Sequence, residues 1–137
     1  MRKVLFVAVI MAACPAVGLA HDIRAGDLRI SHPGCTFVEA RPGVLAAVVK
    51  ISNGGNTDDR LIGASFATAG DVRLDNHRIE DMPGIVIPAG AALVLKPSVI
   101  PLTFADIKSM PVEGQTVSGT LTFARAGTIA VDFEIGG

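Results

Sequence analysis

The chain has 137 residues, of which 50% are hydrophobic and 18% are charged, and it contains neither Trp nor Tyr. This length and composition are those of one compact domain, and they exclude a disordered chain and a multidomain enzyme. With 12 basic and 13 acidic side chains the formal net charge is −1 at pH 7. Nothing in this balance indicates a nucleic-acid-binding surface.

The first twenty residues predict a secretory signal peptide. Arg2 and Lys3 precede an apolar run from Val4 to Ala13, and the small residues Gly18 and Ala20 suit cleavage after Ala20. The apolar run is well short of the roughly 20 residues that a membrane-spanning helix needs. We therefore divide the chain into a signal peptide, residues 1–20, and one exported domain, residues 21–137, without a transmembrane segment.

The two cysteines predict no disulfide, because Cys14 lies inside the leader and only Cys35 remains in the mature chain. The residues Met11-Ala12-Ala13-Cys14 loosely match the cleavage box of a bacterial lipoprotein, in which Cys14 would carry the lipid. Met11 at the first position and Pro15 after the cysteine weaken that match. We expect a protein exported to the periplasm, and lipid anchoring through Cys14 is the alternative.

Beyond residue 22 the apolar residues occur in short runs separated by turn signals, and this pattern indicates an all-β fold. Turn signals recur every eight to twelve residues, as in a β-sandwich of eight or nine strands. The segments that could form these strands are ten candidates: Asp27–Ser31, Cys35–Ala40, Val44–Ser52, Arg60–Phe66, Asp71–His77, Gly84–Ile87, Ala91–Lys96, Ile100–Phe104, Thr116–Ala124 and Thr128–Ile135.

The strongest alternation of apolar and polar residues lies at the end of the chain. It predicts a hairpin of Thr116–Ala124 and Thr128–Ile135, joined through Arg125-Ala126-Gly127. A single helical turn is expected over Ala105–Met110, before Pro111.

Few side chains of the mature chain could carry chemistry. Asp75, His77 and Met82 lie within eight residues between two predicted strands, where a loop could turn them toward one point. Imidazole and thioether are soft ligands that suit copper, and Cu(I) in particular. His21 is a further candidate, since cleavage after Ala20 would free an amino group beside its imidazole. For His32 we expect a hydrogen bond to a neighbouring backbone group rather than a role as a metal ligand.

No known catalytic motif is present. The sequence has no Gly-x-Ser-x-Gly, no His-Glu-x-x-His and no phosphate-binding glycine loop. A lone cysteine such as Cys35 is typically a small core residue rather than a nucleophile. We therefore predict a protein that is not an enzyme.

Five segments together resemble one known family. They are His21-Asp-Ile-x-x-Gly-Asp-Leu-x-Ile-x-His-Pro33, Ile51-Ser-Asn-Gly-Gly-x-x-Asp-Asp-Arg-Leu-Ile-Gly-Ala64, Ile87-Pro-Ala-Gly90, Leu93-Val-Leu-Lys-Pro97 and Gly114-x-Thr-Val-x-x-Thr-Leu-Thr-Phe-x-x-Ala-Gly127. Over nearly the whole mature chain, they resemble the periplasmic copper chaperones of the PCu(A)C family. The resemblance implies a cupredoxin-like, Greek-key β-sandwich that carries Cu(I) toward copper centres such as those of cytochrome oxidase.

The chain departs from that family at the expected metal ligands. By the register of the resemblance, Asp75 stands where the first His is expected, and His77 stands where its partner Met would be. Met82 can serve as the loop Met, but the family's His-x-Met pair falls on Pro101-Leu102-Thr103. A carboxylate is a harder ligand than imidazole, and Pro101 offers no side-chain donor.

Three hypotheses follow. The first is a monomeric, exported copper-binding protein that uses His77, Met82 and Asp75 and delivers Cu(I) to a membrane or periplasmic protein, such as a cytochrome oxidase assembly component. The second is a β-sandwich that binds a protein partner and has lost the metal. The third is copper held by the amino group and imidazole of His21.

Overall fold

The computed structural model describes residues 22–136, and these residues form eleven strands and one short 3-10 helix. The helix is Ile79–Asp81. The strands are β1 (Asp22–Ala25), β2 (Leu28–Phe37), β3 (Leu45–Asn53), β4 (Asp59–Phe66), β5 (Ala69–Leu74), β6 (His77–Arg78), β7 (Ile85–Ile87), β8 (Ala92–Leu95), β9 (Leu102–Ile107), β10 (Thr116–Phe123) and β11 (Gly127–Gly136).

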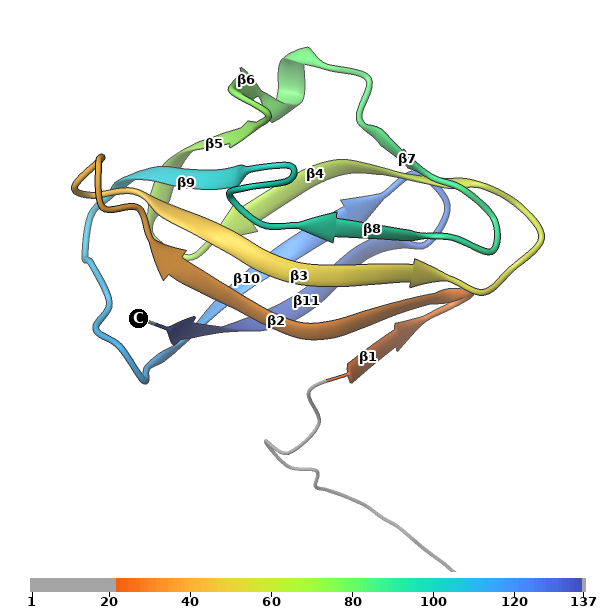
Figure 1. The fold of residues 1–137 in the computed structure, drawn as a ribbon, viewed down its shortest axis with the longest axis horizontal. Helices are drawn as coiled ribbons and strands as arrows, with labels where there is room; N and C mark the ends of the chain where they lie inside the picture. The colour runs from red at the N-terminus through yellow and green to blue at the C-terminus, as the bar shows by residue number, and fades with distance from the viewer. Residues whose placement is uncertain (1–21, 137) are drawn as a thin grey trace, which may run out of the picture.

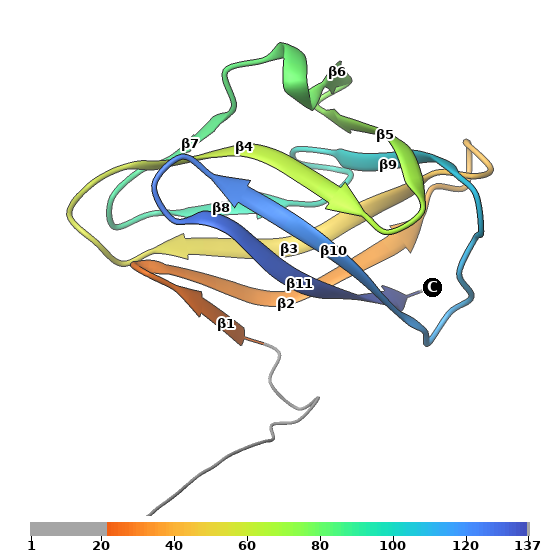
Figure 2. The same ribbon diagram turned by 180° about the vertical axis from the view of Figure 1, so that it is seen from behind.

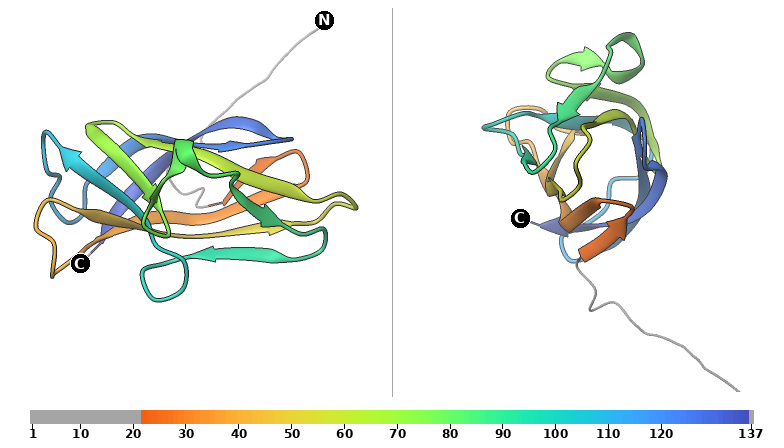
Figure 3. Two further views of the ribbon diagram at one scale, coloured as in Figure 1. Left: turned by 90° about the horizontal axis from the view of Figure 1, so that it is seen from above. Right: turned by 90° about the vertical axis from the view of Figure 1, so that its right-hand side faces the viewer.

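The strands form one continuous sheet in the order β6-β5-β9-β3-β2-β11-β10-β4-β7, with β1 added beside β2 and β8 beside β3. Only the β11–β2 pair is parallel. The sheet curls until its two halves face each other across the core (Figures 1 and 2). Seen along its length, the strands surround a common centre (Figure 3, right). The predicted β-sandwich is confirmed, with more strands than the sequence indicated.

The largest difference in strand boundaries concerns β2. The sequence predicted separate strands before and after Pro33, but β2 runs through both. The register between β2 and β3 shifts between Ser31 and Gly34, and His32 has a φ of 49°. This β-bulge gives the extra residue and the proline a place inside one strand. Strand β1, which pairs with the first half of β2, was not predicted.

The predicted hairpin at the end of the chain is confirmed. Strands β10 and β11 pair from Thr116↔Glu134 to Phe123↔Gly127, with the connecting residues in between. Leu121, Phe123, Val131 and Phe133 are buried, as the alternation required.

The helical turn predicted over Ala105–Met110 is wrong. Strand β9 continues to Ile107, and Asp106 has a φ of 52°, outside the right-handed helical region. Pairing of Ala69 and Asp71 on β5 with Ile107 and Ala105 holds this segment extended. A local helical tendency is therefore overridden by strand pairing.

Three phenylalanines from distant strands meet in the core. Phe66 on β4, Phe104 on β9 and Phe133 on β11 have ring centroids between 5.0 and 6.0 Å apart. Their separations and tilts suit aromatic pairs, which add to the free energy gained by burial. Packing of these three rings stabilises the contact between the two halves of the curled sheet.

We expect Gly119→Ala to destabilise the domain by about 1–3 kcal/mol, the usual range for overpacking. A Cβ atom at Gly119 would lie 2.3 Å from the Ser65 carbonyl oxygen and 2.7 Å from the Phe133 ring. Urea unfolding of the mature chain measures the effect. Gly54→Ala is the control, because its nearest contact would be at 3.7 Å, and an equal loss in both variants would contradict the expectation.

Candidate functional site

The segment from Asp75 to Met82 begins with a tight hairpin. Asp75 and Asn76 have φ angles of 52° and 68°, and Leu74 pairs with His77 across them. Asp and Asn tolerate this left-handed conformation better than most residues. The predicted strand Asp71–His77 is thus wrong at its end, because the chain reverses at Asp75-Asn76. The hairpin brings Asp75 and His77, both exposed, to one exposed tip (Figure 1).

A hydrogen bond to the backbone fixes the orientation of the His77 imidazole. Its Nδ1 lies 2.9 Å from the backbone carbonyl oxygen of Asp75. Because a carbonyl oxygen can only accept a hydrogen bond, Nδ1 carries the proton, and the lone pair of the neutral ring lies on Nε2. A backbone hydrogen bond of this kind orients many metal-binding histidines. His77 therefore offers Nε2 as a prepared nitrogen ligand.

Met82 follows the 3-10 helix, and its amide donates to the Ile79 carbonyl at 3.4 Å. The side chain is half-buried and packs against the core cluster. Its thioether therefore has a packing role as well as a candidate ligand role. Glu80 in the same loop is engaged elsewhere: hydrogen bonds from its own backbone amide and from Arg78 lower the pKa of its carboxyl.

Strand β9 brings the second expected ligand segment beside the hairpin. The Asp75 amide donates to the Pro101 carbonyl at 2.8 Å, and Leu102 and Thr103 pair with Leu74 and Arg73. The two segments that the family resemblance associates with the metal are thus adjacent. Pro101 has no side-chain donor and Thr103 is buried, so this side of the site contributes no nitrogen or sulfur ligand.

A second group of polar residues lies at the start of β1. Asp22 pairs with Ser31, and the Arg29 Nε donates to Asp22 Oδ2 at 3.0 Å. This hydrogen bond is the main reason why the pKa of Asp22 is lowered. The other carboxylate oxygen, Oδ1, is buried and has no hydrogen-bond partner among residues 22–136. The candidate ligand His21 lies outside the described residues.

Cys35 is a core residue, as expected. It lies on β2 with only 2% of its surface exposed, and burial raises the pKa of its thiol to about 12. A thiol binds copper and acts as a nucleophile as its thiolate. Cys35 is therefore a packing residue at neutral pH.

Within residues 22–136, no three His, Cys, Asp or Glu side chains converge as a ready metal-binding group. A copper site of three side-chain ligands here would therefore include another kind of side chain, such as the Met82 thioether, or a group outside that range. The same part of the chain has no helix long and apolar enough to cross a membrane.

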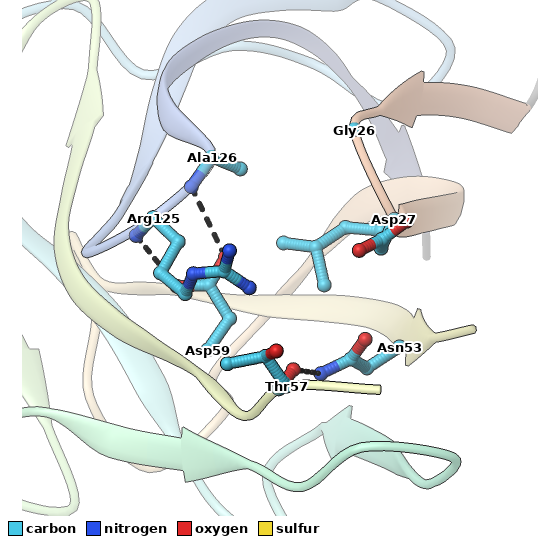
Figure 4. Close-up of a pocket in the computed structure, with 8 residues that line it drawn as sticks. Gly26, Asp27, Asn53, Thr57, Asp59, Arg125 and Ala126 are labelled. Atoms are coloured by element: carbon cyan, nitrogen blue, oxygen red, sulfur yellow. Dashed lines mark hydrogen bonds between the residues drawn. The ribbon is translucent and has the colours of Figure 1, made fainter. Parts of the chain in front are cut away.

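The sequence did not predict the role of Asp59, a buried residue whose carboxylate stabilises the fold. The Asp59 carboxylate accepts hydrogen bonds from the amides of Arg60, Arg125 and Ala126 at 2.7 to 3.1 Å. The last two amides belong to the β10–β11 turn (Figure 4). A cavity of about 110 Å³ lies beside Asp59, bordered by the β1–β2 turn and Asn53. The only signal in the sequence was a carboxylate at the start of an apolar strand.

Asn53 serves the same end of the molecule. Its side-chain amide donates to the carbonyls of Thr57 and Ile87, both at 2.9 Å, and its oxygen accepts from Gly55. These bonds fix the loop between β3 and β4 and attach it to β7. The cavity between Asn53 and Asp59 thus belongs to a rigid end of the fold.

Solved structures of copper proteins share this fold. The "Copper-bound PCuAC domain from PmoF2" is 23% identical with a TM-score of 0.74, and the match covers 85% of this chain and 98% of that one. The "Apo PCuAC domain from PmoF1" is 21% identical with a TM-score of 0.75, over 85% and 99% of the two chains. The Cu(I) form of DR1885 from Deinococcus radiodurans is 19% identical with a TM-score of 0.65, over 87% and 83%.

The chain is therefore a cupredoxin-like β-sandwich of the PCuAC type, and the resemblance to that family is confirmed at the level of the fold. The family described as "Putative lipoprotein LpqE-like" matches residues 17–135, and the chain belongs to that family. A comparison with curated protein sequences finds no match.

Proposed function

We propose that this protein binds copper, as Cu(I) in preference to Cu(II), and passes it to another exported protein. The observation that carries the proposal is the tip of the β5–β6 hairpin, where His77 is exposed with Nδ1 bonded to the Asp75 carbonyl at 2.9 Å. That tip lies beside Pro101, at the position where the PCuAC resemblance expects the metal. The shared fold with copper-bound PCuAC domains supports the same reading.

The proposed ligands are His77 Nε2 and the Met82 thioether, with the Asp75 carboxylate as a third. Imidazole and thioether are soft ligands that suit Cu(I). A site of two or three ligands, of which Asp75 and His77 are exposed, exchanges metal readily, which favours transfer over storage. Such a transfer needs no acid, base or nucleophile, so we propose no catalytic step.

A second set of ligands is supported by the start of β1. His21 precedes Asp22, and His32 follows Ser31, so the two histidines flank one cross-strand pair. Cleavage after Ala20 would add the amino group of His21 to this set. Asp22 Oδ1 accepts no hydrogen bond from the described residues, and this supports a cation at the same place. This set is harder than the first and suits Cu(II).

We propose export to the periplasm through the leader of residues 1–20. The description of the family as a lipoprotein supports anchoring through Cys14 as the alternative. The two routes affect the ligands differently, because only cleavage after Ala20 frees the His21 amino group. The recipients we propose are membrane or periplasmic copper proteins, such as cytochrome oxidase assembly components.

Titrations of residues 21–137 against a competing chelator, with Cu(I) in the absence of oxygen and separately with Cu(II), test the two ligand sets. If the hairpin tip holds the metal, His77→Ala and Met82→Ala each weaken binding by about tenfold to a hundredfold or more, the range for a lost supporting group. Met110→Ala is the control, because Met110 is an exposed methionine of the β9–β10 loop. It should leave the affinity unchanged.

One extra residue before His21 separates the remaining outcomes. If this extension or His32→Ala abolishes binding while His77→Ala does not, the start of β1 holds the metal. If the unaltered chain competes with the chelator for neither Cu(I) nor Cu(II), the metal-free alternative is correct. The protein is then a partner-binding sandwich, as the residues Asp75, Pro101 and Thr103 would favour.

A further inference from the structure

One outer surface of the sheet collects basic side chains. Arg24 on β1 lies opposite Arg29 on β2, and the row continues to Ser52 on β3. In the next row, Lys50 on β3 lies between Ser31 and Val94 on β8, and Lys96 follows Val94 by two residues. Residues directly opposite in a sheet point to the same face. We call this surface, with Asp22 and Glu134 at its edge, the basic face.

The basic face stands out against the charge of the rest of the domain. It holds four basic and two acidic side chains, whereas the remaining residues from 22 to 136 hold six basic and eleven acidic ones. One of the two acidic groups, Asp22, is already paired with Arg29. An acidic protein therefore presents one surface of opposite sign, and charge of this kind attracts an anionic partner.

The centre of the basic face is apolar. Val48 and Val94 are 40% and 37% exposed between the lysines. Gly34 opposite Val48 has no side chain, and the bulge of β2 lies next to it. The surface is hollowed there: two adjoining hollows of about 230 and 400 Å³ are both bordered by His32, Val48 and Lys96.

The part of the chain outside the described residues joins the domain at this face. Residue 22 begins β1, at the edge of the basic face, and the predicted apolar leader ends at Ala13. Nine residue steps separate Ala13 from Asp22, so the chain spans at most about 30 Å between them. While that leader is in a membrane, or if Cys14 keeps a lipid, the edge of the basic face at Asp22 stays within reach of the bilayer.

We propose that the basic face docks on an anionic lipid bilayer, with Arg24, Arg29, Lys50 and Lys96 against the headgroups and Val48 and Val94 at the centre of the contact. The basic charge suits either an anionic bilayer or an acidic protein, and the position of the chain entry favours the bilayer. The proposal does not depend on copper binding. It would hold the protein beside the membrane with the β5–β6 tip, on another side of the molecule, open to a recipient (Figures 1 and 3).

The test measures partition of residues 21–137 onto vesicles of equal parts phosphatidylglycerol and phosphatidylethanolamine at low salt. Each basic residue near an anionic surface contributes about 1 kcal/mol, so Lys50→Gln with Lys96→Gln should weaken partition about thirtyfold. Salt at 1 M shortens the Debye length to about 3 Å and should release the unaltered protein.

The matched control is Arg41→Gln with Lys108→Gln, which removes the same charge from two exposed residues of other loops. It should change partition by less than about threefold, since these residues lie away from the contact. Thermal unfolding of both double variants verifies that they fold. Equal losses in the two variants, or equal partition onto phosphatidylcholine vesicles, overturn the proposal. No partition onto the anionic vesicles also overturns it and leaves an acidic protein as the partner of this face.

Discussion

Asp59→Ala should lower the free energy of unfolding by about 3 kcal/mol. The change removes the acceptor of three backbone amides, two of which come from a turn more than sixty residues away in the sequence. A buried donor left without a partner costs about 1–3 kcal/mol, and bonds to a charged acceptor lie at the upper end of this range. Water entering the neighbouring cavity of about 110 Å³ would recover part of the loss. Urea unfolding of the mature chain measures the difference.

Asp58→Ala is the matched control for this prediction. Asp58 is the preceding residue, and its carboxylate is exposed and accepts one hydrogen bond, from the Ala89 amide at 2.9 Å. We expect it to cost about 1 kcal/mol or less. If the two variants unfold at the same urea concentration, Asp59 does not hold the β10–β11 turn to the start of β4.

Phe104→Ala should cost about 3–5 kcal/mol, the range for deleting a buried aromatic ring. Phe104 is fully buried and contacts both other rings of the aromatic cluster, with centroids 5.0 Å from Phe66 and 5.5 Å from Phe133. Its removal leaves a cavity between β4, β9 and β11, and the paired strands around it cannot close without breaking register.

Phe104→Leu keeps most of the volume and should cost much less than Phe104→Ala. Thermal or urea unfolding of both variants provides the comparison. A loss below about 1 kcal/mol for Phe104→Ala would show that the site collapses freely, against the packing described above.

The sequence predicted the fold where one face of a strand is buried and the other is exposed. Strands β10 and β11 are the best case, because their alternation fixes both the register and the core residues. Strand β1 was missed, since four residues with only Ile23 and Ala25 apolar carry too little pattern. The bulge at His32-Pro33 was missed because a proline inside a strand usually ends it.

The candidate site was less predictable than the fold. The sequence placed Asp75, His77 and Met82 in one loop, but it could not show that a two-residue turn ties His77 Nδ1 to the Asp75 carbonyl. Nor could it show that Asp22 Oδ1 is buried without a hydrogen-bond partner in the described part of the chain, which depends on the pairing of β1 with β2. Asp59 depends on contacts with Arg125 and Ala126, and no local pattern carries that information.

The central claim is that this chain carries copper, and the amount of metal retained tests it most directly. Residues 21–137 are loaded with Cu(I) without oxygen, passed over a desalting column in the presence of a competing chelator, and analysed for copper per chain. We expect one copper ion per chain in the unaltered protein and less than half of that in the His77→Ala, Met82→Ala double variant. A protein that emerges without copper contradicts the account.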